Sequence, residues 1–246
     1  MLNRFAIRLC AVYALEGRTF ADAEVRDSEI VPIDPEGNDG DTKPFVAIYT
    51  DDQSPDGVTL TFEIGASARM AARDPESGKD VIVPGIPPTD SGIEALLDMM
   101  ERQIHVALND ENNTWAQLLK IVCKDLQLTG SRRGAMKTQS GERFAGREIV
   151  FTGKPLNDPE FGREITGGSF WGRFLAQAEA EPHLVDFATK FRALLTDGTS
   201  IENWRLVLRA LGASRQAGDG LGVTPPMGMD TSPDITEAQT EMDVSE

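Results

Sequence analysis

The residues that could carry catalysis or bind a metal are few and scattered. The sequence contains two histidines, His105 and His183, and each falls within or at the start of a predicted helix. A general base or a metal ligand needs partner groups held close to it, and no such group is indicated for either histidine. We expect both to lie on a helix surface or at the edge of the core. We predict no metal site and no cofactor.

Two glycine-containing segments are superficially similar to catalytic motifs. Residues 167–171 read Gly-Gly-Ser-Phe-Trp, but a nucleophile elbow needs glycine where Trp171 stands and an apolar strand before it. Residues 153–154 read Gly-Lys, but a phosphate-binding loop needs a hydroxyl residue where Pro155 follows. No set of residues pairs a base with a nucleophile. We therefore predict that the protein is not an enzyme.

A group of basic residues stands out because the chain is acidic, with 40 acidic and 24 basic residues and a formal net charge of −16. A predicted loop over residues 129–146 is rich in glycine and basic side chains. This loop is open to two interpretations: a solvated loop, or a contact with an acidic patch on a neighbouring subunit. Contacts of the second kind, repeated head to tail, would close a ring. The basic residues are Arg132, Arg133, Lys137 and Arg143.

The composition limits the class of protein. Hydrophobic residues make up 40% of the 246 residues, enough for a core. The acidic balance argues against the nucleic-acid backbone as the main ligand, although it is compatible with a surface that DNA passes without binding. Cys10 and Cys123 are predicted to be buried free thiols, as expected in a reducing cytoplasm. No signal peptide and no apolar stretch of about 20 residues is apparent, so we expect a soluble, unexported protein.

The first half of the chain predicts one helix followed by strands. Apolar residues at helical spacing predict a helix over 3–16. Residues 25–33 and 45–50 are rich in β-branched and apolar residues and predict strands. Residues 58–64 alternate apolar and polar side chains, which indicates a strand with one buried face in an antiparallel sheet. The short connections favour a meander.

The middle of the chain predicts two helices that can cover such a sheet. Residues 65–89 are polar and proline-rich and predict a long excursion with a small hairpin at 81–83. A helix follows to about residue 109, and Ser91 with Glu94 has the pattern of a capping box. A second helix is predicted from Thr114 as far as Leu126.

After the basic loop, residues 148–152 predict a last strand. The order α-β-β-β-α-α-β predicts an α+β fold: an antiparallel or mixed four-stranded sheet with helices packed on one face.

The last third differs in character. Helices are predicted over 169–179, onward from Pro182, and over 201–211. Beyond Arg215 there is no basic residue, and acidic residues accumulate among glycine and proline, which predicts a disordered tail. The predicted organisation is an α+β domain over 1–156, a helical extension over 157–213 and an acidic tail over 214–246.

Several short segments resemble the tail terminator proteins of long-tailed bacteriophages. The resemblance covers roughly residues 3–156: the opening helix followed by Gly-Arg-Thr at 17–19, the segment 25–34, and Pro-Phe-Val-Ala-Ile-Tyr-Thr at 44–50. It continues through the alternating strand, the helix over 91–109 and the late strand. The helical extension and the acidic tail depart from the family pattern.

The resemblance implies a mixed α/β subunit that forms a hexameric ring on the head-proximal end of the tail tube. Such a ring would end tube polymerisation, present the surface for head–tail joining, and let DNA pass without sequence-specific binding. The implied partners are the protein itself, the tail tube protein and a head-completion protein, within a virion assembled in the bacterial cytoplasm. A head–tail connector or neck subunit is the alternative, and a small-molecule-binding or enzymatic domain is a third.

Overall fold

The computed structural model describes residues 2–28, 43–54, 57–137, 143–159 and 165–196. Helices and strands are both present, and the predicted α+β class is confirmed. The chain divides into two compact units. The first comprises residues 1–159 and 166–188, and the second comprises 160–165 and 189–246. The predicted helix over 201–211 and the predicted acidic tail lie outside the described residues.

The sheet has five strands in the order β1-β2-β3-β7-β6, one more than predicted. The strands are β1 (Val25–Asp27), β2 (Phe45–Ser54), β3 (Gly57–Ser67), β6 (Cys123–Lys137) and β7 (Arg143–Pro155). All neighbours are antiparallel except β1 and β2, which are parallel. The predicted meander is therefore wrong for the first pair. The rest of the strand predicted over 25–33, from residue 29 on, lies outside the described residues.

The basic loop predicted over 129–146 is wrong, because both of its sides are strand. From Gly130 to Lys137, β6 pairs residue by residue with β7 from Val150 to Arg143. The sequence does not predict this hairpin, because Gly, Arg and Ser interrupt any alternation of apolar residues. Cross-strand hydrogen bonds determine the strand conformation instead. The helix predicted to reach Leu126 ends at Val122. Cys123 already has extended backbone and pairs with Pro155 of β7 as the first residue of β6.

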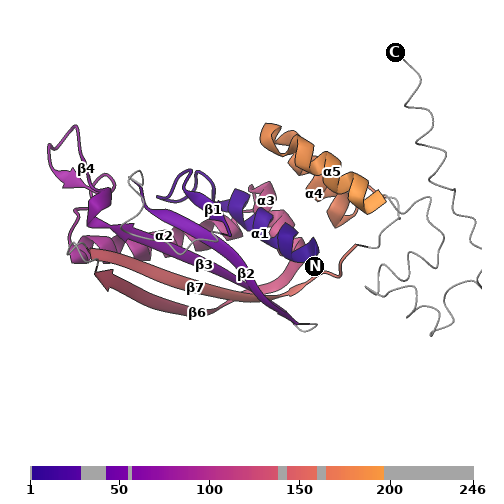
Figure 1. Ribbon diagram of the computed structural model, residues 1–246, viewed down its shortest axis with the longest axis horizontal. Coiled ribbons are helices and arrows are strands. Elements are labelled where there is room, and N and C mark those ends of the chain that lie inside the picture. The colour runs from indigo at the N-terminus through magenta and orange to yellow at the C-terminus, as the bar shows by residue number, and fades with distance from the viewer. Residues whose placement is uncertain (1, 29–42, 55–56, 138–142, 160–164, 197–246) are drawn as a thin grey trace, which may run out of the picture. The chain divides into compact units, whose positions relative to one another are not determined.

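The helices lie along one face of the sheet (Figure 1). They are α1 (Leu2–Leu15), α2 (Asp90–Asn109) and α3 (Thr114–Val122). On β3, the apolar side chains of the predicted alternation are all buried, and Phe62 meets Phe151 of β7 edge to face, with ring centroids 5.5 Å apart. The apolar stripe predicted along α2 is also buried and packs toward β3 and β7 of the sheet. Its residues are Ile93, Leu96, Leu97, Met100, Ile104 and Leu108.

Smaller elements complete the described chain. The excursion after β3 contains η1 (Ala68–Met70), β4 (Ala72–Arg73) and β5 (Asp80–Val81), followed by a bridge between Val83 and Ile86. The helices after β7 are α4 (Phe170–Ala180), η2 (Pro182–Leu184) and α5 (Val185–Thr196). Pro182 does begin a helical turn, as its sequence position predicted.

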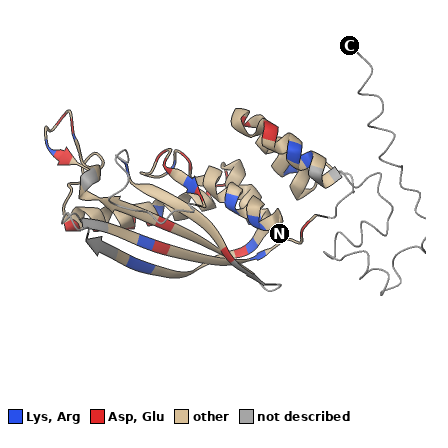
Figure 2. Ribbon diagram, viewed as in Figure 1, with Lys and Arg blue, Asp and Glu red and all other residues tan. Residues whose placement is uncertain are grey.

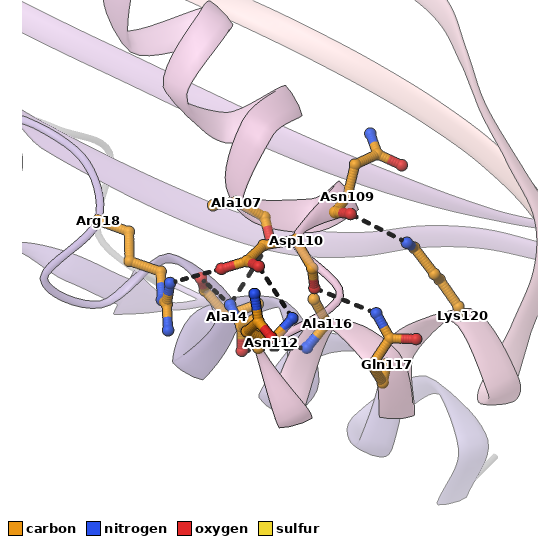
Figure 3. Close-up of polar contacts among 10 residues, drawn as sticks. Ala14, Arg18, Ala107, Asn109, Asp110, Asn112, Ala116, Gln117 and Lys120 are labelled. Atoms are coloured by element: carbon orange, nitrogen blue, oxygen red, sulfur yellow. Dashed lines mark hydrogen bonds and ion pairs between the residues drawn. The ribbon is translucent and has the colours of Figure 1, made fainter.

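A buried asparagine joins the three helices that cover the sheet. Asn113 is 3% exposed and caps α3, its side chain accepting a hydrogen bond from the backbone N–H of Ala116 at 3.3 Å. Its amide donates to the carbonyl of Ala14, the last turn of α1, at 2.9 Å, and to that of Ala107 in α2 at 3.5 Å. The surrounding turn is held by further polar contacts, including that of Arg18 with Asp110 (Figure 3).

Replacing Asn113 with alanine should therefore destabilise the fold by about 1–3 kcal/mol, because the cap is lost and two buried carbonyls lose a donor. Asn112 is the matched control: it is exposed and enters the same turn through its backbone N–H, which donates to Asp110. Asn112→Ala should change stability by less than about 0.5 kcal/mol. Denaturant unfolding measures both, and equal effects would contradict this role of Asn113.

Candidate interaction surface

The residues considered for catalysis have structural partners. His105 packs on the ring of Phe151 with centroids 5.3 Å apart, and His183 Nε2 lies 2.7 Å from the hydroxyl of Tyr13. Ser169 caps α4 by accepting a hydrogen bond from the backbone N–H of Gly172 at 3.0 Å. Among the described residues, no three His, Cys, Asp or Glu side chains gather as metal ligands.

Packing also accounts for the presence of Gly153 and of the two cysteines, Cys10 and Cys123. Gly153 lies in β7, where an added Cβ would fall 2.5 Å from Cys123 Sγ, so only glycine fits. Cys10 and Cys123 are free and buried, as the sequence predicted. Burial raises the pKa of the Cys10 thiol well above its usual value and that of Cys123 to about 12. Both thiols are therefore protonated and unreactive at neutral pH.

A dense charge interaction among the described residues joins the β6–β7 hairpin to α2. Arg147 is 14% exposed and lies 2.7 Å from Glu101 and 2.7 Å from Asp98, with Glu94 at 3.7 Å. The three carboxylates recur every three or four residues along α2, so they share one side of the helix. Burial lowers the pKa of Arg147, but hydrogen bonds to Glu101 and Asp98 outweigh it and raise the pKa. We call this set the Arg147 cluster.

The predicted capping box is wrong, and the Arg147 cluster explains why. Thr89 caps α2, its hydroxyl accepting from the backbone N–H of Gly92 at 3.1 Å. Glu94 turns away from the helix start toward the sheet, where its Oε1 lies 2.8 Å from the guanidinium Nη2 of Arg133. Glu94 Oε1 is buried and has no hydrogen-bond partner among the described residues. Its contact with Arg133 is therefore an ion pair that lacks hydrogen-bond geometry.

The structure does not bring the four predicted basic residues together as one patch. Arg132 and Arg133 are neighbours on β6, so their side chains point to opposite faces of the sheet. Arg133 points to the helix side and pairs with Glu94, yet it remains 65% exposed. Lys137 and Arg143 are backbone partners at the end of the hairpin, and the description of these two residues extends to the backbone alone.

Charged residues form a row across the opposite face of the sheet. The register places Arg26, Ala47, Glu63, Glu148 and Arg132 side by side on five successive strands. Two carboxylates therefore face each other directly at the centre of this row, a destabilising arrangement. Figure 2 shows a basic and an acidic position next to each other on β7, beside basic positions on β6.

A shallow depression of about 220 Å³ lies beside this row. In the adjacent row, Phe45 is followed by Gly65, Gly146 and Gly134, so three strands in succession carry no side chain there. The depression exists because the missing side chains leave the backbone uncovered. Its lining includes Phe45, Glu63, Arg132, Gly134, Gly146 and Glu148.

The outer strand β6 offers a long backbone edge. It is the last strand in the sheet order, and within the described residues it pairs with β7 alone. Register shifts at Lys124–Gln127 and Leu128–Gly130 interrupt its first half, and Asp125 has a positive φ of 54°. From Gly130 to Lys137 the pairing is regular. Unpaired N–H and C=O groups on such an edge are available to another strand.

Two parts of this surface were not predicted from the sequence. Arg147 falls between the loop predicted over 129–146 and the strand predicted over 148–152, so neither prediction includes it; the repeat of Glu94, Asp98 and Glu101 every three or four residues on α2 is the signal that could have identified its partners. The row that includes Glu63 depends on the strand register, which the sequence does not reveal.

Searches against models of known protein families and against curated proteins find no match. Within the described chain, no helix is long and apolar enough to cross a bilayer.

The facing carboxylates generate a prediction about pH. Burial, then repulsion from Glu148 and Asp51, raises the pKa of Glu63 above its usual value, while a hydrogen bond from Tyr49 opposes this. The folded state therefore binds the proton more tightly than the unfolded state, and stability falls as pH rises through the interval between the two pKa values. Above both pKa values the penalty is fully present.

Glu63→Gln should thus stabilise the protein at pH 7 by about 0.2–1 kcal/mol, the size of a cross-strand charge pair. The gain should disappear at about pH 3, well below the ordinary glutamate pKa of about 4.3, where the wild-type carboxyl is protonated in both the folded and the unfolded state. Thermal unfolding of both proteins at the two pH values measures this. A gain that persists unchanged in acid would show that charge repulsion is not its source.

Proposed function

We propose that the protein is a structural, non-enzymatic subunit that assembles into a ring and caps the head-proximal end of a bacteriophage tail tube. The observation that carries the proposal is the regular edge of β6, from Gly130 to Lys137, with Arg132 and Arg133 exposed on a chain of net charge −16. Such an edge is suited to pairing with another polypeptide.

The α+β class supports the proposal because it agrees with the subunit that the sequence resemblance implies. The partners of the candidate catalytic residues support it too, since the histidines, the cysteines and Ser169 all serve packing or capping within the described chain. The acidic charge is compatible with a ring through which DNA passes, because like charges repel. The partners proposed are further copies of the chain, a tail tube protein and a head-completion protein.

Native mass spectrometry and electron microscopy of the purified protein, alone and with tail tubes, test the proposal directly. The expected result is a closed ring, formed by the protein alone or on tube ends, together with tubes that no longer elongate. A monomer that neither binds nor caps tubes would contradict it.

Loss of the gene separates the tail terminator from a neck subunit. Under the proposal, infection without the protein yields free heads and tails of abnormal length. Tails of normal length that fail to join heads would instead identify a head–tail connector. The two outcomes are distinguished by electron microscopy of the lysate.

A further inference from the structure

We infer that the β6 edge binds the acidic C-terminal segment of a neighbouring copy, residues 234–246, as an added antiparallel or parallel strand. The inference rests on the proposed self-association but adds what holds the copies together. It combines three observations: a regular edge that pairs with β7 alone within the described residues, basic side chains on both of its faces, and a complementary segment within the same sequence.

The edge itself selects an extended partner. The first half of β6 is interrupted by two register shifts, which oppose the addition of a strand, whereas Gly130–Lys137 runs without interruption over eight residues. Residues 131–134 are exposed. An added strand would use the N–H and C=O groups that point away from β7, which are every second pair along the strand.

The charges of the edge select an acidic partner. Arg132 and Arg133 are exposed and point to opposite faces of the sheet, so acidic side chains on either face of an added strand meet a guanidinium. Among the described residues Arg132 forms no ion pair, and Arg133 pairs with Glu94 while remaining 65% exposed. Two copies of β6 placed edge to edge would oppose their own arginines, which disfavours self-pairing of this strand.

The C-terminal sequence has the required composition. After Arg215 the chain contains no Lys or Arg, and residues 234–246 contain neither glycine nor proline. This stretch of 13 residues is long enough to pair with the eight-residue edge. In extended backbone its acidic residues alternate onto both sides, with Glu237, Glu241 and Asp243 on one side and Asp234 and Glu246 on the other.

The test uses two variants of the full chain that complement each other. The tail variant replaces the five acidic residues of 234–246 with Asn or Gln and keeps the edge. The edge variant carries Arg132→Gln and Arg133→Gln and keeps the tail. A matched control carries Lys79→Gln and Arg102→Gln, which remove two exposed charges elsewhere. Amide hydrogen exchange by NMR is read at residues 130–137.

In the wild type, the outward-pointing amides should exchange at least about tenfold more slowly than in the tail variant, while the amides bonded to β7 stay unchanged. The control variant should match the wild type. Mixing isotope-labelled tail variant with unlabelled edge variant should restore slow exchange to the labelled copy, because its intact edge then receives the intact tail of the other copy.

Three outcomes would overturn the inference. Equal exchange in wild type and tail variant would mean that the arginines only protect the edge from aggregation. Fast exchange that mixing does not restore would place the tail on its own chain. Rings that form while the β6 amides exchange fast would leave the proposed function standing without this contact. Restored exchange in a protein that forms no ring would support the contact and reject the proposed function.

Discussion

The arrangement of the sheet edge depends on the Arg147 cluster. A hairpin at the side of a sheet is bonded to one neighbour only, so its outer strand needs a second support to hold its position. Arg147 provides that support by reaching from β7 to Glu101 and Asp98 on α2, with 14% of its side chain exposed. Ser131 of β6 adds a hydrogen bond to the same Glu101 at 3.3 Å. The helix layer and both strands of the hairpin are thereby joined through one carboxylate.

This support determines what remains available on β6. The acidic side of α2 pairs with Arg147 and only in part with Arg133, which keeps 65% of its side chain exposed on the helix side of the edge, while Arg132 stays on the other face. The backbone from Gly130 on is held straight and regular, which is what pairing with another chain requires. The proposed assembly therefore uses a surface whose shape is fixed within the subunit before a partner binds.

The amino-acid sequence predicted the elements that bury an apolar stripe and missed those that do not. The α2 stripe and the alternation on β3 follow from side-chain periodicity, which the core enforces, and both are confirmed. In the hairpin of β6 and β7, Gly, Arg and Ser interrupt the apolar periodicity that would predict a strand, so its strands depend on hydrogen bonds between segments that the sequence does not pair. The parallel pairing of β1 with β2 likewise depends on tertiary contacts that local side-chain periodicity does not encode.

The candidate surface shows the same division. Arg132, Arg133, Lys137 and Arg143 were identified from charge alone, which indicates an unusual segment but not its conformation. Strand alternation then separates Arg132 from Arg133, and the ion pair of Arg133 with Glu94 ties part of the group to its own subunit. Arg147, which joins the hairpin to the helix, looks no different in sequence from any other arginine, because its partners are about 50 residues away.

A double-mutant cycle between Arg147 and Glu101 tests most directly whether this cluster holds the hairpin. The single variants Arg147→Met and Glu101→Gln and the double variant are compared by denaturant unfolding, with the exposed pair Arg133 and Glu94 as the reference cycle. If the cluster holds the hairpin, the coupling should be about 1–2 kcal/mol for the first pair and less than about 0.5 kcal/mol for the second. Additive effects of Arg147→Met and Glu101→Gln, within about 0.3 kcal/mol, would contradict this role.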